Sequence, residues 1–214
     1  MNEAAAKMDA IYRVQRHFYD LTRKPYLLGR DVLIRELVPP PSANILEIGC
    51  GTARNLLRIA RRYPAARCYG IDVSAAMLQT AGAAIQREGL GGRVRVERAD
   101  ATSFDPSKLF GVGRFDRIVI SYALSMIPDW KAVLRQATGM LTPAGALYVV
   151  DFGDQAELPA WFRKGLFAWL DRFSVTPRLD LRAQLGEMTR SRNQSCRFRT
   201  LYRGYAVLAE LRGQ

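Results

Sequence analysis

The sequence has few of the side chains that bind metals or form disulfides. Its 214 residues include one histidine, His17, and three cysteines, Cys50, Cys68 and Cys196, which lie far apart. An odd number of widely spaced cysteines argues against a disulfide framework, and the lack of a Cys/His cluster argues against a zinc site. We therefore expect no metal centre and no metal-dependent mechanism.

Long apolar runs are also lacking. No stretch approaches the roughly 20 consecutive apolar residues that a membrane-spanning helix requires. Charged residues interrupt the first 20 positions, so we expect no secretory signal there. The sequence shows no internal repeat and no low-complexity tract. These features favour a cytoplasmic protein, either soluble or attached to a surface.

Acidic residues are scarce relative to basic ones. There are 32 lysines and arginines against 20 aspartates and glutamates, which gives a formal net charge of +12. This balance favours an anionic partner, such as nucleic acid, an acidic substrate or an anionic membrane surface. Most of the basic residues are arginines, however, and a GC-rich genome alone produces that bias. Both interpretations stay open at this point.

Strands and helices alternate after the triple proline at 39–41. This alternation predicts βαβ units, hence a Rossmann-like, doubly wound α/β fold with a mostly parallel seven-stranded sheet and an antiparallel C-terminal hairpin. Ligands of such sheets bind beyond the carboxyl ends of the strands. We expect strands at 44–49, 67–71, 93–98, 115–120 and 146–150, two more within 194–211, a turn at 142–145, and helices at 52–62, 74–86, 130–140, 158–173 and 180–190.

The segment before the triple proline is predicted to form a helical cap. Residues 3–21 have amphipathic spacing, a break follows at Lys24-Pro25, and a second short helix is expected over 30–38. We accordingly divide the chain into an N-terminal cap, 1–41, and a catalytic domain, 42–214.

A glycine-rich turn follows the first expected strand, in the run Ile45-Leu46-Glu47-Ile48-Gly49-Cys50-Gly51-Thr52. Glycines let the backbone approach a ligand closely, and the following helix offers free N–H groups. A dinucleotide site would have a third glycine where Arg54 stands. The carboxylate of Glu47 would also repel a pyrophosphate, whereas it would attract the ammonium and sulfonium of S-adenosylmethionine (SAM). SAM is therefore the favoured cofactor, with S-adenosylhomocysteine (SAH) as its product.

Two further acidic residues follow neighbouring strands. Asp72 ends the second strand, where a carboxylate can accept both ribose hydroxyls. Asp100 ends the third strand and is suited to the adenine amino group, while Val73 offers an apolar face for adenine. We also place Ala101 and Ser121 at the cofactor site. Each aspartate alone has a structural alternative, since Asp also caps helices.

Residues 44 to about 150 resemble the class I SAM-dependent methyltransferases. The motifs LEIGCGT, GIDVS and AD carry this resemblance, and Ala53 departs from it because many members have glycine there. An intact set of Glu47, Gly49, Gly51 and Asp72 favours a catalyst over a non-catalytic SAM-binding protein.

Several further stretches resemble the bacterial betaine-lipid N-methyltransferases: Tyr19–Arg23, Tyr26–Asp31, Ser121–Trp130 and Val150–Gln155. That resemblance implies methyl transfer from SAM to the amine of diacylglyceryl-homoserine, which yields the trimethyl betaine lipid. A phosphatidylethanolamine or ornithine-lipid N-methyltransferase is the runner-up, and a soluble small-molecule methyltransferase is a further alternative. No RNA-binding module is evident, so we expect no nucleic acid partner.

An amine acceptor must lose a proton before methylation. An alkyl ammonium in water has a pKa near 10.4, so its deprotonation at pH 7 costs roughly 4–5 kcal/mol. Apolar, aromatic surroundings lower that pKa. The predicted catalytic residues are Tyr19, Tyr122 and Asp151, with Asp151 binding the ammonium or relaying its proton. The resemblance places Tyr19 over the SAM as well. Tyr12 and Tyr26 are expected to line the site as well, and His17 is a weaker candidate. Packing of the cap on the sheet is the structural alternative for Tyr12 and Tyr19.

The expected helix at 158–173 combines tryptophans with basic residues. Trp161 and Phe167 flank an apolar stripe and lie beside Arg163, Lys164 and Arg172. This composition suits an interfacial helix on anionic lipid, although simple packing on the sheet would also explain it. We expect an aminolipid substrate and peripheral attachment to the inner face of the cytoplasmic membrane.

Overall fold

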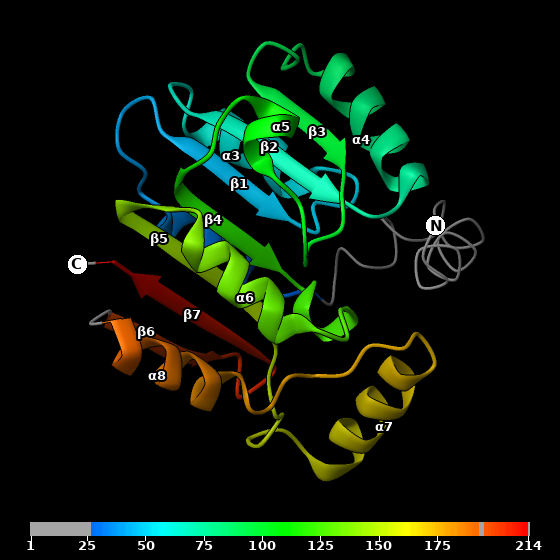
Figure 1. Ribbon diagram of the computed structural model, residues 1–214. Coiled ribbons are helices and arrows are strands. Elements are labelled where there is room, and N and C mark those ends of the chain that lie inside the picture. The colour runs from blue at the N-terminus through cyan, green and yellow to red at the C-terminus, as the bar shows by residue number, and fades with distance from the viewer. Residues whose placement is uncertain (1–26, 193–194, 214) are drawn as a thin grey trace.

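The computed structural model describes residues 27–192 and 195–213, and its centre is a seven-stranded sheet with the order β3-β2-β1-β4-β5-β7-β6 (Figure 1). Strands β1 to β5 are parallel, and β7 is antiparallel to both β5 and β6. This confirms the predicted doubly wound sheet with its antiparallel C-terminal hairpin. The strands are β1 Asn44–Ile48, β2 Arg67–Asp72, β3 Val94–Arg98, β4 Phe115–Ser121, β5 Leu141–Phe152, β6 Ser195–Leu201 and β7 Ala206–Arg212.

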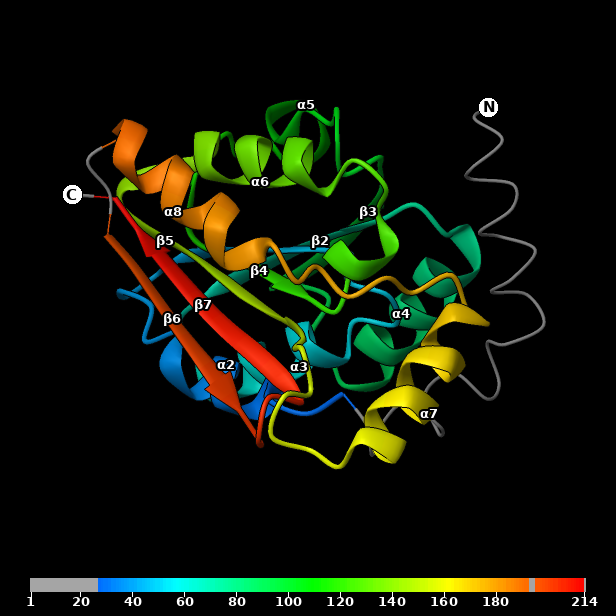
Figure 2. The same cartoon turned by 90° about the horizontal axis from the view of Figure 1, so that it is seen from below.

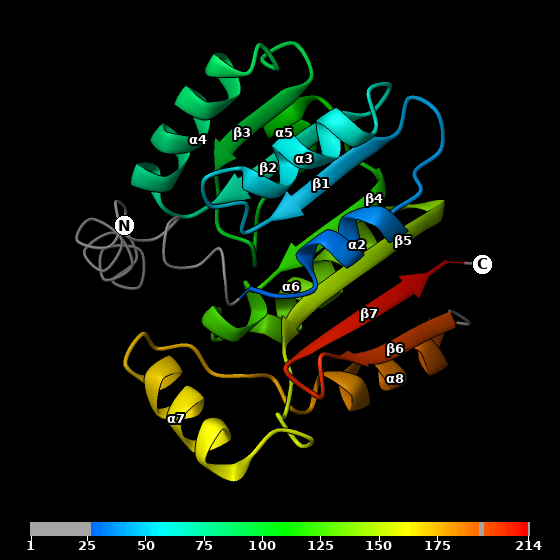
Figure 3. The ribbon, with the colours of Figure 1, turned by 180° about the vertical axis from the view of Figure 1, so that it is seen from behind.

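Helices cover both faces of the sheet. One face carries α2 (Arg30–Glu36), α3 (Arg54–Arg62) and α4 (Ala75–Arg87), as the view from behind shows (Figure 3). The other face carries α5 (Pro106–Phe110), α6 (Trp130–Gly139) and α8 (Leu181–Arg192). A 3-10 turn, η1 (Leu124–Met126), follows β4, and α7 (Ala160–Asp171) lies beyond the carboxyl end of β5 (Figure 2).

The central strands are buried on both faces, as strands of a covered parallel sheet must be. Ile45 belongs to the apolar core under α2, α3 and α4, whereas Leu46 and Ile48 face the core under α6 and α8. No helix within the described residues is long and apolar enough to cross a bilayer. Ser74 caps α4, because its hydroxyl accepts a hydrogen bond from the Met77 amide.

Two elements differ from the sequence-based expectation. The turn predicted at 142–145 lies inside the longer strand β5, where the pairing with β4 shifts register: Phe115 pairs with Leu141, but Arg117 already pairs with Ala146. The expected turn is therefore a bulge within the strand rather than a break before it. The five-residue helix α5 was not predicted, since it is too short for a periodic apolar pattern; Asp105 caps it and Pro106 opens it.

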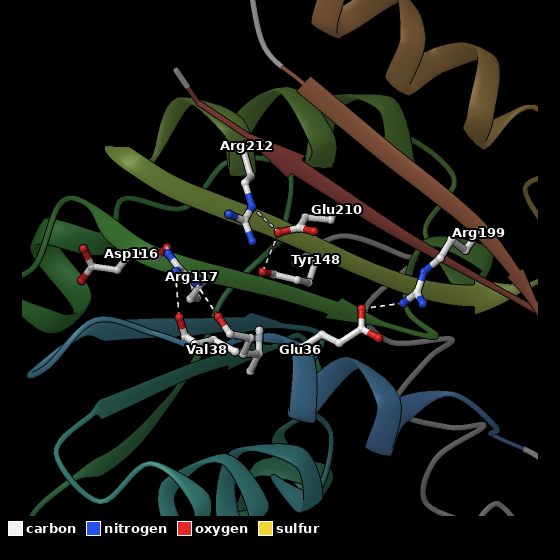
Figure 4. A network of polar contacts seen from close by, with 9 residues as sticks. Glu36, Val38, Asp116, Arg117, Tyr148, Arg199, Glu210 and Arg212 are labelled. Atoms are coloured by element: carbon white, nitrogen blue, oxygen red, sulfur yellow. Dashed lines mark hydrogen bonds and ion pairs between the residues drawn. The ribbon is translucent and has the colours of Figure 1, made fainter.

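Polar contacts tie α2 and the segment after it to the sheet (Figure 4). The guanidinium of Arg117 on β4 donates to the carbonyls of Leu37 and Val38, at 2.7 and 3.0 Å. Arg199 on β6 pairs with Glu36 at 2.5 Å. The helix predicted at 30–38 thus exists and rests against the sheet. The helix predicted at 3–21 lies outside the described residues, and the cap boundary at residue 41 stays a prediction.

Candidate active site

The turn after β1 brings two glycines to the carboxyl edge of the sheet. Gly49 and Gly51 both have positive φ angles, 73° and 53°. A Cβ on Gly49 would lie 2.6 Å from the Cβ of Ala123, so no larger residue fits there. A Cβ on Gly51 would meet no atom within 4 Å. Gly51 therefore borders open space, where the backbone is accessible to a ligand.

Glu47 is buried directly beneath this turn, with 1% of its surface exposed. One carboxylate oxygen accepts a hydrogen bond of 2.7 Å from the side-chain amide of Asn55 on α3. The other oxygen has no hydrogen-bond partner among the residues that the structure describes. Burial raises the pKa of Glu47 to about 8, although Asn55 and the nearby Arg30 oppose the shift. An unpaired buried carboxylate oxygen is costly, and a cationic ligand at this edge would stabilise its charged form.

Asp72 joins the glycine turn to the start of α4. One of its oxygens accepts a hydrogen bond of 2.8 Å from the amide of Gly51, and the other accepts one of 2.9 Å from the amide of Ser74. Val73, half-buried, follows it at the same edge. Asp72, the residue predicted to bind the ribose, therefore also fixes the conformation of the turn.

Asp100 and Ala101 follow β3 at the same edge. Asp100 is exposed, and one of its oxygens accepts hydrogen bonds from the amide and hydroxyl of Thr102, at 2.8 and 2.7 Å. Ala101 is half-buried against the core under α6. The carboxyl ends of β1, β2 and β3 thus present Glu47, Asp72 and Asp100, as the spacing predicted, while their roles toward a ligand stay predictions.

Ser121 and Tyr122 end β4. The Ser121 hydroxyl is buried and finds no hydrogen-bond partner in residues 27–192 and 195–213. Tyr122 is 4% exposed, adopts a positive φ of 55°, and donates a 2.5 Å hydrogen bond to the carbonyl of Leu28. Its ring meets that of Phe152 edge-on at 4.7 Å between centroids. Burial raises the pKa of Tyr122 well above its usual value, so the hydroxyl stays a protonated donor.

Asp151 lies behind this aromatic pair and is 1% exposed. Its two oxygens accept backbone hydrogen bonds from Ser125 and Phe152, at 3.1 and 2.8 Å. Burial raises its pKa to about 6, against the effect of these hydrogen bonds and of Arg178. The carboxyl group therefore titrates near neutral pH while it holds η1 at the end of β4. Tyr19, Tyr12, Tyr26 and His17 lie outside the described residues.

Two site residues were missed at the sequence level. Asn55 is buried on α3 and orients Glu47. Arg30 is 9% exposed, and burial together with the nearby Arg54 lowers its pKa to about 10. Arg30 lies close enough to Glu47 and Tyr122 to interact with both electrostatically. Arg30 lies within the stretch Tyr26–Asp31 that carries the lipid-methyltransferase resemblance, but only the fold reveals that its guanidinium lies near Glu47.

A narrow apolar cavity lies beside Tyr122, between the strand ends and α7. Its walls are almost entirely aliphatic and aromatic. They comprise Leu27, Tyr122, Met126, Phe152, Trp169, Leu170, Phe173 and Val175. A cavity of this composition accepts an apolar or aromatic ligand group, or an amine whose charge is held against ring faces.

Comparison with known proteins agrees with this geometry. Residues 45–145 match the family model for the methyltransferase domain. Together with the strand order and the glycine turn, this match supports a class I SAM-dependent methyltransferase domain around residues 45–145.

Individual relatives are enzymes of several kinds. The chain is 34% identical to the trans-aconitate 2-methyltransferase of Deinococcus radiodurans over 54% of this chain and 41% of that protein. It is 31% identical to the demethylmenaquinone methyltransferase of Mycolicibacterium gilvum over 71% of this chain and 60% of that protein. The chain thus spans about half the length of these curated relatives. The plantazolicin methyltransferase BpumL, solved with SAH, shares the fold at 15% identity, with a TM-score of 0.72 over 99% of this chain and 98% of its own.

The residues present fit a SAM cofactor. Gly51 leaves the space that an added Cβ would fill. One oxygen of Glu47 and the hydroxyl of Ser121 are buried polar atoms without partners in the described part of the chain. The register places these two polar residues near the ends of adjacent strands, since Ile48 pairs with Ile120. Buried polar groups in native proteins have partners as a rule, and a bound cationic nucleoside would supply them here.

Tyr122→Phe tests the link between this site and the segment before α2. Loss of the hydroxyl leaves the carbonyl of Leu28 without its donor, so the free energy of unfolding should fall by about 1–2 kcal/mol. Urea denaturation followed by circular dichroism measures this change. Tyr69→Phe is the matched control, because its hydroxyl makes only a 3.4 Å contact with Asn44. Equal effects of the two substitutions would contradict the anchoring role of Tyr122.

Proposed function

We propose that the protein is a SAM-dependent N-methyltransferase that acts on the amine of a lipid headgroup. Diacylglyceryl-homoserine, converted to its trimethyl betaine, is the leading acceptor, and phosphatidylethanolamine or an ornithine lipid is the alternative. The observation that carries this proposal is the cavity lined by aliphatic and aromatic side chains that begins at Tyr122, next to the predicted cofactor residue Ser121.

The cavity suits an amine nucleophile. Its apolar walls disfavour the ammonium form and so lower the pKa of a bound amine. Positioning the amine in line with a methyl donor contributes about 7–11 kcal/mol, so a strong base is not required. Bound SAM would supply an electrophilic methyl group. The rings of Tyr122, Phe152 and Trp169 line the cavity, and each can attract a methylated ammonium by about 0.5–2 kcal/mol.

Charged residues next to the cavity have complementary roles. Asp151, with a pKa of about 6, is a carboxyl group that can take up charge or a proton near neutral pH. Arg30 is a buried guanidinium suited to a carboxylate, and SAM carries one on its methionyl group. Glu47, Asp72 and Asp100 remain the proposed ligands of the cofactor's ammonium, ribose and adenine.

A second candidate is methyl transfer to a nonlipid small molecule. The relatives named for trans-aconitate and demethylmenaquinone favour it. An apolar cavity is also compatible with an apolar small molecule, so the acceptor must be identified directly.

The decisive experiment is mass spectrometry of lipids from a bacterial host that expresses the chain, with and without a coexpressed source of diacylglyceryl-homoserine. We expect mono-, di- and trimethylated homoserine lipid only when both are present. Methylated phosphatidylethanolamine in the host alone would favour the alternative lipid. Gly51→Ala is the matched control for methylation by host enzymes. An unchanged lipid profile in every strain would refute the lipid proposal.

A further inference from the structure

Helix α7 is the least buried helix of comparable length around the site. Leu170 is its only buried residue. Trp161, near its first turn, is 75% exposed, which makes it the most exposed large apolar side chain among the described residues. A large aromatic side chain in water is an informative exception in a folded protein, and nothing within the described part of the chain covers it.

The inner side of α7 already has a role. Phe162 approaches the ring of Tyr205, at 6.4 Å between centroids, and Trp169 meets Phe173 at 5.0 Å. Trp169, Leu170 and Phe173 form one wall of the apolar cavity. The helix is therefore held to the protein by this side, and most of its other residues are exposed.

Beside the inner side runs a continuous exposed strip, which we call the outer face of α7. It runs along the helix at intervals of three and four residues, so its members share one side. The outer face consists of Trp161, Lys164, Gly165, Ala168 and Arg172, all exposed. Two basic residues flank two small ones, with the tryptophan at one end.

Charge favours an anionic surface over an apolar protein groove. From 160 to 173 the segment carries three basic residues, including Arg163, and one acidic residue, Asp171. The chain as a whole is at +12. Tryptophan is a typical side chain at the membrane interface, and nearby lysines and arginines are attracted to anionic headgroups. Gly165 and Ala168 add no bulk that would hold the helix away from a flat surface.

We propose that the outer face of α7 docks on an anionic phospholipid bilayer, with Trp161 inserted at the headgroup level. Because the same helix walls the apolar cavity, docking places that cavity next to the bilayer from which a lipid headgroup would enter. This inference rests on the proposed lipid substrate and names the surface through which the site reaches it.

The test is binding of the full-length protein to vesicles of phosphatidylglycerol and phosphatidylcholine, measured by co-sedimentation. We expect Trp161→Ala to weaken binding by at least about tenfold, which corresponds to loss of a buried large side chain. The double variant Lys164→Glu/Arg172→Glu should weaken it similarly. Binding of the wild type should fall as salt rises.

Matched controls lie at the opposite end of the sheet. Val38→Ala removes another exposed apolar side chain, 68% exposed. Arg87→Glu/Lys108→Glu changes the net charge equally, and Arg87, like Arg172, is near the end of a helix. These controls should bind like the wild type. Quenching of tryptophan fluorescence by brominated lipid should be clearly stronger in the wild type than in Trp161→Ala, in which the buried Trp130 and the less exposed Trp169 remain.

Several results would overturn the inference. One is that the wild-type protein does not bind the vesicles. Another is that Trp161→Ala binds them as well as the wild type does. A third is that Trp161→Ala changes only the oligomeric state measured by light scattering. The last result would assign the outer face to a second copy of the chain. Methylation of an aminolipid in detergent micelles separates the two proposals, because Trp161→Ala should retain it. Absence of methylation by the wild type in micelles would refute the lipid substrate, whatever the vesicles show.

Discussion

Gly51→Ala is expected to weaken SAH binding by about 10–100-fold, since overpacking at a close contact costs about 1–3 kcal/mol. The free energy of unfolding should fall by only about 1–2 kcal/mol, the cost of alanine in the left-handed region. The effect on SAH binding should exceed the effect on stability because of what surrounds Gly51. A methyl group at this position meets no protein atom within 4 Å, so it fills the space proposed for the cofactor instead.

Gly49→Ala is the informative comparison. Its added methyl would lie 2.6 Å from the Cβ of Ala123, in addition to the strain of its positive φ. Gly49→Ala should therefore lower the free energy of unfolding more than Gly51→Ala does. Isothermal titration calorimetry with SAH, together with urea denaturation of both variants, measures the difference. Unchanged SAH affinity in a folded Gly51→Ala protein would remove this turn from the cofactor site.

Glu47→Gln is expected to stabilise the protein at alkaline pH and to weaken SAM binding. The folded-state pKa of Glu47, about 8, lies above its ordinary value of 4.5. A raised carboxyl pKa means that the folded state favours the protonated form. The contribution of Glu47 to the free energy of unfolding is fully present below about pH 4 and is lost as the pH rises to about 8. The loss is roughly 3–5 kcal/mol at full ionisation.

Glutamine keeps an oxygen that can accept the hydrogen bond from Asn55 but cannot ionise. The slope of stability against pH between 5 and 8 should therefore flatten in Glu47→Gln. In the wild type, a cationic cofactor should favour ionisation, so binding should release protons and strengthen as the pH rises. Calorimetry in buffers of different ionisation enthalpy counts those protons. Equal proton release by the two proteins would show that Glu47 is not the group that responds.

The elements that form the site edge could be predicted because each leaves a local pattern. The apolar run before Gly49 and the aspartates at 72 and 100 lie where the spacing placed them. Arg30 and Asn55 left no such signal, because their importance comes from contacts across the fold with Glu47. The left-handed backbone of Tyr122 was also invisible, since a tyrosine gives no hint of a positive φ.

The hydrogen-bond partners of Asp151 could not be predicted from the sequence. Its place at the end of β5 followed from the strand pattern, but its hydrogen bonds to the amides of Ser125 and Phe152 depend on how η1 folds back. Sequence can place a carboxylate at a strand end, yet it cannot say whether backbone amides or a ligand will bind it.

The position of β7 between β5 and β6 has a consequence for how the chain folds during synthesis. β6 leaves the ribosome before β7 but joins the sheet only through it. Until residues 206–212 emerge, the edge of β5 lacks its neighbour, and its backbone groups are open to pairing with another chain. Correct assembly therefore depends on the last strand arriving before that edge finds a different partner.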